Sequence, residues 1–113
     1  MANVTRGTTL AGHARHANTF WTRMKGLLGT KGLEPDTGLV IEPCNSVHMF
    51  WMKYALDVVF ADRDGQVLGA VRELKPWRMS SMYRGARYAI ELPVGVIDAS
   101  STEVGDRLSL EPA

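Results

Sequence analysis

The chain has 113 residues, of which 45% are hydrophobic and 22% are charged, and thirteen basic side chains nearly balance twelve acidic ones. This length and composition predict one domain, residues 1–113, and exclude a disordered or fibrous protein. A formal charge of +1 argues against nucleic acid as a partner, because nucleic-acid binding normally needs a marked basic excess. No apolar run suits a signal sequence or a membrane span, and a single cysteine fits a reducing compartment. We therefore expect a cytoplasmic protein with no membrane partner.

The first third of the chain predicts an edge strand followed by one short helix. Residues 3–16 are rich in Thr, Ala and Gly, which is typical of an extended segment with a loop. Within residues 18–32, apolar side chains recur at the spacing of one helix face. They are Phe20, Met24, Leu27 and Leu28. The sequence therefore predicts a short N-terminal helix.

After Pro35 the sequence changes to short extended runs separated by turn residues. These runs are residues 38–43, 47–52, 55–62, 66–74, 86–93 and 105–110. The "RDG" between the third and fourth runs predicts a hairpin, because Gly supplies the positive φ of such a turn. A helical turn is predicted in 95–101, and 75–85 is a longer irregular connection. Six or seven strands with little helix predict a mostly-β fold, either a compact sandwich or a barrel.

Five sequence fragments occur together in a fixed order. They are "R-x-x-GL" from Arg23, "S-V-H-x-x-x-M" from Ser46, "LD-x-x-F" from Leu56, "ELPxG" from Glu91 and "GD" at Gly105. In this order they resemble the family called Domain of Unknown Function 192, over about residues 15–110. The resemblance implies a compact β-sandwich of jelly-roll type, and it implies no reaction. We predict no cofactor. Leu28 and Ala55 depart from the family pattern by apolar exchanges that should leave the fold intact.

Cys44 and His48 are the candidate catalytic residues. A catalytic thiol needs a neighbour that favours the thiolate, and a turn at "PCNS" would bring this thiol to the imidazole. Alternatively, Cys44 is a small buried hydrophobe and His48 a hydrogen-bonded strand residue. No cysteine-hydrolase signature surrounds the thiol. One cysteine and three histidines are a poor ligand set for zinc, so we predict no metal site.

Asp57 and Glu91 interrupt two apolar strands and are candidate ligand-binding acids. Each points away from the aliphatic face of its own strand, either to solvent or to a concave second face. A partly covered carboxylate needs a partner, because desolvation otherwise raises its pKa. We predict a ligand-binding cleft where Asp57 and Glu91 converge with Arg23 and His48. The alternative is an ion-pair network that fixes the helix against the sheet.

Trp77 completes the predicted ligand-binding set, because it lies in the mixed apolar and basic connection 75–85. Loops of this length carry function more often than short ones. Three classes of function follow. We favour a non-catalytic module that binds a small polar ligand or a peptide. The alternatives are a small hydrolase or isomerase that uses the Cys44–His48 or the Asp57–Glu91 pair, and an interaction or assembly factor that binds through residues 75–85.

Overall fold

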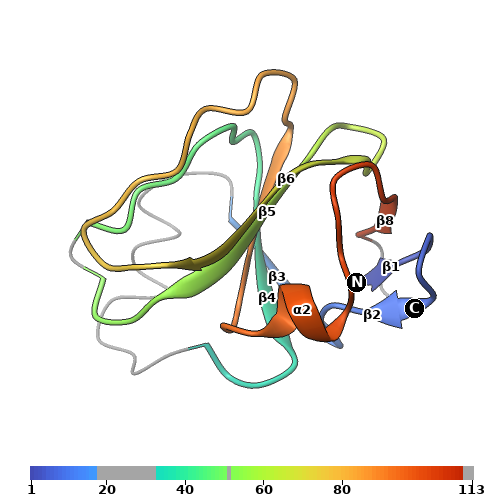
Figure 1. The fold of residues 1–113 in the computed structure, drawn as a ribbon, viewed down its shortest axis with the longest axis horizontal. Coiled ribbons are helices and arrows are strands. Elements are labelled where there is room, and N and C mark those ends of the chain that lie inside the picture. The colour runs from blue at the N-terminus through green and yellow to red at the C-terminus, as the bar shows by residue number, and fades with distance from the viewer. Residues whose placement is uncertain (18–32, 51, 111–113) are drawn as a thin grey trace.

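The computed structural model describes residues 1–17, 33–50 and 52–110, which fold as two β-sheets and one short helix (Figure 1). The large sheet has the order β3-β4-β7-β5-β6 and the small sheet the order β2-β1-β8. The strands of the large sheet are β3 (His13–Ala17), β4 (Thr37–Ile41), β5 (Leu56–Ala61), β6 (Val67–Leu74) and β7 (Tyr88–Leu92). The others are β1 (Ala2–Asn3), β2 (Thr8–Thr9) and β8 (Leu108–Ser109), and the helix is α2 (Val96–Ala99).

The mostly-β class predicted from the sequence is confirmed, and the barrel is not found in the part of the chain that the structure describes. The large sheet is open there, because β3 and β6 lie at its two ends. The hairpin predicted at "RDG" forms between β5 and β6, and Gly65 has a φ of 87°. The helix predicted over residues 18–32 lies outside the described residues. The described helix, α2, is the helical turn predicted in residues 95–101.

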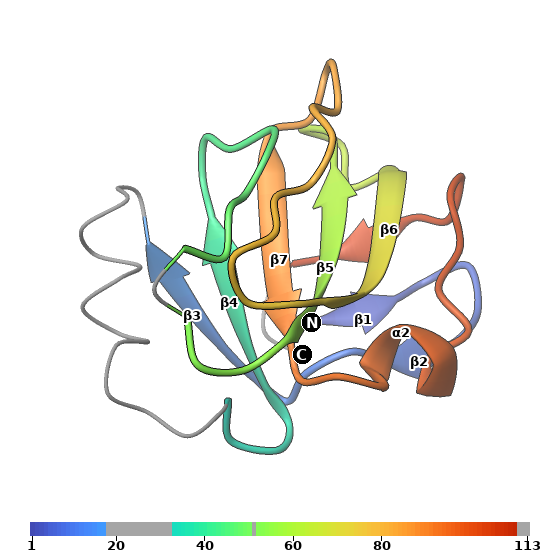
Figure 2. The ribbon, with the colours of Figure 1, turned by 60° about the vertical axis from the view of Figure 1, so that its left-hand side comes forward.

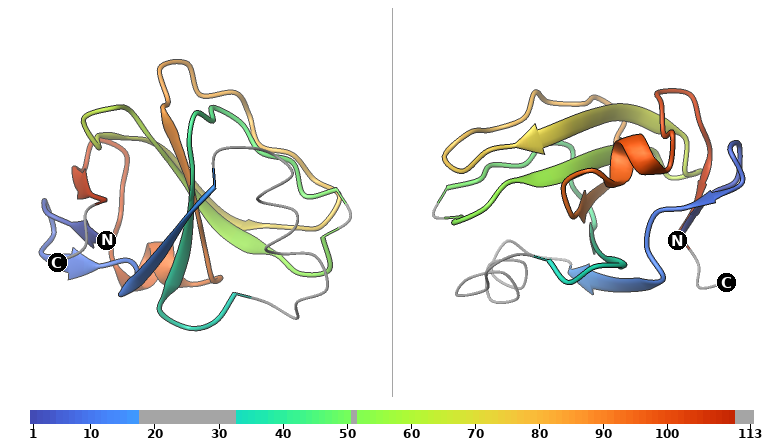
Figure 3. Two further views of the ribbon diagram at one scale, coloured as in Figure 1. Left: turned by 180° about the vertical axis from the view of Figure 1, so that it is seen from behind. Right: turned by 60° about the horizontal axis from the view of Figure 1, so that its bottom comes forward.

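Both faces of the large sheet are covered, so its central strands are buried throughout. Every residue of β5 is buried. Leu56, Val58 and Phe60 face one hydrophobic cluster, and Val59 faces a second cluster on the other side. Figure 3 shows what covers the two faces: the small sheet and α2 lie toward one side, and long loops lie toward the other. Alternation along the central strands β5 and β7 therefore does not separate buried from exposed positions.

Residues 44–50 and 75–84 run side by side as irregular segments that cover the first cluster (Figures 1 and 2). Backbone hydrogen bonds join them: Trp77 N donates to Met49 O, Ser80 N to Val47 O, and Tyr83 N to Asn45 O, each at 2.8 Å. The strand predicted over residues 47–52 is wrong for the described part of that range. It contributes one isolated bridge, from His48 to Met79. On either side of that bridge the facing segment departs from strand geometry, because Trp77 has a φ of 65° and Val47 N donates to the side chain of Ser80.

Tyr83 anchors this loop to the sheet. Its ring stacks on Phe60 with centroids 4.4 Å apart, and it covers Gly69 so closely that a Cβ at that position would overlap the ring. The absence of a side chain at Gly69 is therefore what lets the loop lie against β6.

Gly69→Ala is expected to lower the free energy of unfolding by about 1–3 kcal/mol, because the added methyl group overpacks the contact. Since Tyr83 must move, the backbone hydrogen bonds of residues 77–83 should also exchange faster with solvent. Chemical denaturation and amide hydrogen exchange measure the two effects. Wild-type exchange in residues 77–83 would contradict this role of Tyr83.

A buried polar network joins residues 3–6 to residues 102–106. The Asp106 carboxylate accepts hydrogen bonds at 3.0 Å from Asn3 Nδ2, Arg6 Nε and Glu103 N. Asn3 Nδ2 also donates to Thr102 Oγ1 at 3.1 Å. These bonds fix a turn at Gly105 and Asp106, where Gly105 has a φ of 96°.

The network should make stability depend on pH below about 4. Hydrogen bonds from Arg6 and then Asn3 lower the pKa of Asp106 from 3.8 to about 2. A lowered pKa in the folded state contributes stability that is complete above the unfolded value of 3.8 and is lost as the pH falls toward 2. In urea denaturation at several pH values, Asp106→Asn should lack this loss, whereas Asp64→Asn, at an exposed position, should keep it. If the free energy of unfolding fell with pH in parallel for the wild type and Asp106→Asn, the pH dependence would not come from Asp106.

Candidate functional site

Asp57 holds three segments together. Its Oδ2 accepts hydrogen bonds from Gly95 N at 3.1 Å and Ile97 N at 2.9 Å, and its Oδ1 accepts one from Glu73 N at 2.9 Å. The residue is 1% exposed. A buried carboxylate is stabilised by such amide donors, and these three fix the start of α2 and an irregular point of β6. Three backbone amides occupy this carboxylate, so it is poorly placed to bind a ligand.

Glu91 and Asp57 lie on opposite faces of the large sheet. Glu91 is paired across the strands with Leu39 and Val58, so it shares their face, the face of the first cluster. Asp57 precedes Val58 on β5 and therefore points to the other face. Glu91 is also fully buried. The structure does not bring the two predicted acids into one cleft.

Cys44 and His48 lie at the start of the paired loops. The thiol of Cys44 donates a hydrogen bond to Ser46 O at 3.0 Å. The ring of His48 stacks on Phe50, with centroids 4.7 Å apart. Both side chains are partly exposed, and the catalytic role of the pair stays a prediction.

Trp77 is the most accessible of the predicted site residues that the structure describes. Its side chain is 60% exposed, and its ring lies 6.0 Å from that of Phe50. His48, Phe50 and Trp77 therefore form a row of rings that ends at the surface. Arg23, the remaining predicted residue, lies outside the described residues.

The loop that carries Trp77 exposes further large side chains. Met79 is 64% exposed and Met82 72% exposed. Two exposed basic residues, Arg78 and Arg84, lie in the same loop. We call this set the loop surface; it consists of Trp77, Arg78, Met79, Met82 and Arg84. The two methionines were absent from the predicted site, although three large apolar residues in a loop without strand alternation were a usable signal.

The backbone at Trp77 is strained. Its φ is 65°, in the left-handed region that bulky side chains rarely adopt. Such a conformation costs roughly 1–3 kcal/mol and persists only where its surroundings enforce it. Here the hydrogen bond from Trp77 N to Met49 O enforces it. Both the exposed indole and the strained backbone would be disfavoured at this position if only the stability of the fold mattered.

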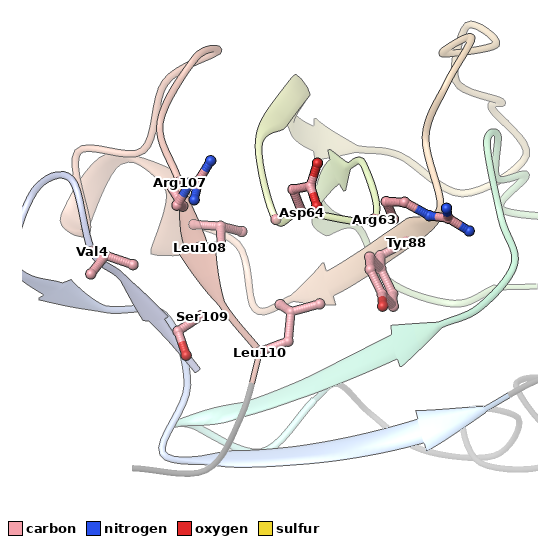
Figure 4. A pocket seen from close by; sticks show the side chains of 9 residues that line it. Val4, Arg63, Asp64, Tyr88, Arg107, Leu108, Ser109 and Leu110 are labelled. Carbon is pink, nitrogen blue, oxygen red and sulfur yellow. The ribbon is translucent and has the colours of Figure 1, made fainter.

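A shallow hollow of about 350 Å³ lies at another place, between the 62–65 turn and β8 (Figure 4). Its lining includes Arg63, Asp64, Tyr88 and Arg107. Figure 4 shows Arg107 and Arg63 on opposite sides of Asp64, with the side chain of Arg63 directed away from Arg107. Ligand pockets usually bring a few polar groups together. This hollow lacks that convergence, and none of the predicted site residues lines it.

Two further observations apply only to the described residues. Within 1–17, 33–50 and 52–110, no three His, Cys, Asp or Glu side chains gather as a metal-ion site would require. In the same part of the chain, no helix has the length and apolar character needed to cross a membrane.

Comparisons with known proteins place the chain among close relatives. The family model for DUF192, described as "Uncharacterized ACR", matches residues 2–110. A UPF0127 protein of Pyrococcus furiosus is 39% identical over 114 residues, which cover 96% of this chain and 95% of that protein. One of Thermococcus sibiricus is 34% identical over 98% of this chain and 74% of its own length. The crystal structure of a Novosphingobium aromaticivorans protein of unknown function has a TM-score of 0.72 at 19% identity; the match covers 83% of this chain and 71% of that one.

Proposed function

Because this chain belongs to the DUF192 family, which brings no reaction with it, we propose a function from its surface: a non-catalytic module that binds a peptide segment on the loop surface. The observation that carries the proposal is the exposure of Trp77, Met79 and Met82 on a loop whose backbone is hydrogen-bonded to residues 45–49. Exposed apolar side chains mark interaction sites where several of them gather, and these three lie within six consecutive residues of one loop. A pre-ordered support lowers the entropy lost on binding.

A peptide suits this surface better than a small molecule. Small ligands prefer concave pockets that enclose most of their area, whereas Trp77, Met79 and Met82 are each more than half exposed. Trp, Met and Arg are enriched where proteins contact other proteins. The strain at Trp77 adds support, because strained backbone is frequently found at binding sites.

The proposal is tested by selecting binders from a displayed library of random dodecapeptides and measuring their affinity for variants of the chain. Met79→Ser/Met82→Ser should weaken binding at least about tenfold, the usual effect of removing central contacts. Val94→Ser/Val104→Ser is the matched control, because those valines are 51% and 65% exposed but lie outside the loop. The control should bind like the wild type.

Enrichment of no peptide, or an equal loss of affinity in both double variants, would show that the loop surface is not the binding site. Both variants should denature at the wild-type urea concentration, since surface substitutions of this kind change stability by about 0.5 kcal/mol or less.

An interaction or assembly factor would use the same loop surface, with the peptide segment belonging to a folded partner. Enzymatic alternatives have less support. Asp57 is occupied by three backbone amides, and the Cys44 thiol donates to a carbonyl.

A further inference from the structure

The paired segments that form and support the loop surface lie within two stretches of the chain, residues 43–56 and 74–90, that are basic and have no acidic residue. Residues 43–56 and 74–90 contain five of the thirteen Lys and Arg residues and none of the twelve Asp and Glu residues. The remainder of the chain therefore has an excess of acidic residues, although the whole is balanced at +1. Residues 1–33 also contain five Lys or Arg residues and no Asp or Glu. Of these two basic parts of the sequence, residues 43–56 and 74–90 are the part that includes the exposed Trp77, Met79 and Met82.

Most of these cations have no carboxylate beside them. Arg87 pairs with Glu42, with Nη2 and Oε1 2.9 Å apart. The other four are exposed, and within the described residues none of them forms an ion pair. They are Lys53, Lys75, Arg78 and Arg84. Their charges therefore stay available to a partner.

We infer that the peptide bound at the loop surface is acidic, with Asp or Glu residues flanking apolar side chains. This inference rests on the proposed function and names the chemistry of its ligand. Trp77, Met79 and Met82 supply the apolar contact area, and the surrounding cations select the charge of the partner. Opposite charges also speed association, and salt screens them over a distance of about 10 Å at 0.1 M.

A short acidic peptide suits the molecule better than a long polyanion does. All twelve acidic residues lie in residues 34–42, 57–73 and 91–111, and they would repel a nucleic acid that extends from the loop surface over those parts of the chain. Tight binding of DNA also needs many phosphate contacts. A dodecapeptide is short enough to remain within the basic region. Exposed methionines also suit a peptide partner, because the flexible Met side chain adapts to varied apolar side chains.

Three fluorescein-labelled pools of dodecapeptides test the inference. All three carry Leu, Met or Phe at the same positions, and the other positions hold Asp or Glu, Ser or Gln, or Lys or Arg. By fluorescence anisotropy at about 50 mM NaCl, the acidic pool should bind at least about tenfold more tightly than the neutral pool, and the difference should shrink at about 300 mM. Arg78→Glu/Arg84→Glu should remove the difference. Arg63→Glu/Arg107→Glu, which reverses two exposed arginines at the hollow, should keep it.

The outcomes separate this inference from the proposed function. If the neutral pool binds as tightly as the acidic one and Met79→Ser/Met82→Ser weakens both, the loop surface binds peptides but the inference is wrong. If no pool binds, the proposed function is wrong as well. Tighter binding of a twelve-nucleotide oligo-dT or of phosphatidylserine vesicles than of the acidic pool would also overturn it, because the anionic partner would then be a nucleic acid or a membrane.

Discussion

Trp77→Gly is expected to abolish measurable binding of the selected dodecapeptides while leaving the fold about as stable as the wild type. The indole is 60% exposed, so its removal takes away a large contact area on the partner's side and only part of the intramolecular packing. Glycine adopts the φ of 65° without strain, and relief of that strain offsets the lost packing. A substitution at this one position should therefore lower the affinity for the peptide without lowering the stability of the fold.

Trp77→Ala is the variant to compare with Trp77→Gly, because it removes the indole without relieving the backbone strain. It also removes the indole, but alanine keeps a Cβ in the left-handed region, which costs roughly 1–2 kcal/mol. Both variants should lose affinity equally, and Trp77→Gly should be the more stable by about 1 kcal/mol in chemical denaturation. If Trp77→Gly bound the selected dodecapeptides with wild-type affinity, the proposed site would be wrong. Equal stability of the two variants would contradict only the assignment of strain.

Asp57→Ala is expected to destabilise the fold strongly, lowering the free energy of unfolding by about 3–5 kcal/mol. It leaves the amides of Glu73, Gly95 and Ile97 without their acceptor at a site that is 1% exposed. Each buried donor that loses its partner costs about 1–3 kcal/mol. Chemical denaturation measures the loss, and the far-UV spectrum in the absence of denaturant reports whether the variant still folds.

Asp62→Ala is the matched control for that experiment. Asp62 Oδ1 also accepts backbone hydrogen bonds, from Asp64 N and Gln66 N at 2.9 Å each, but in an exposed turn. Water can replace an acceptor there, so the expected loss is below about 1 kcal/mol. Similar losses in the two variants would mean that burial does not determine the role of Asp57.

The longer strands after Pro35 could be predicted because each of them carries a local signal. Alternation and turn residues located β5, β6 and β7 to within a residue or two, and glycine at position 65 marked the hairpin. These are local properties, in which side chains a few residues apart decide the conformation.

The site could not be predicted in the same way, because it depends on how strands pair. Asp57 and Glu91 look alike in sequence, each being an acid between two apolar residues. The pairing of Val58 with Glu91 puts them on opposite faces, and nothing within either strand encodes that register. The burial of both faces of the large sheet likewise could not be predicted from its strands, because it depends on the loops and the small sheet that cover them.

Several motifs of the family receive a structural explanation from this arrangement. The Asp57 of "LD-x-x-F" binds the amide of Gly95 in "ELPxG", and the Asp106 of "GD" gathers residues 3–6. These residues fix the fold. The "S-V-H-x-x-x-M" fragment is different, because Val47 and Met49 hold the backbone of the exposed loop. It supports the loop surface through its backbone, and the Phe60 of "LD-x-x-F" supports it through the ring of Tyr83.

Amide hydrogen exchange with and without a selected dodecapeptide tests the central claim most directly. The peptide should slow exchange in residues 75–84 and in the supporting residues 44–50, with no change in α2 or in the 62–65 turn. Protection centred on the hollow between that turn and β8, or no protection in residues 75–84, would contradict the claim that the loop surface is the binding site.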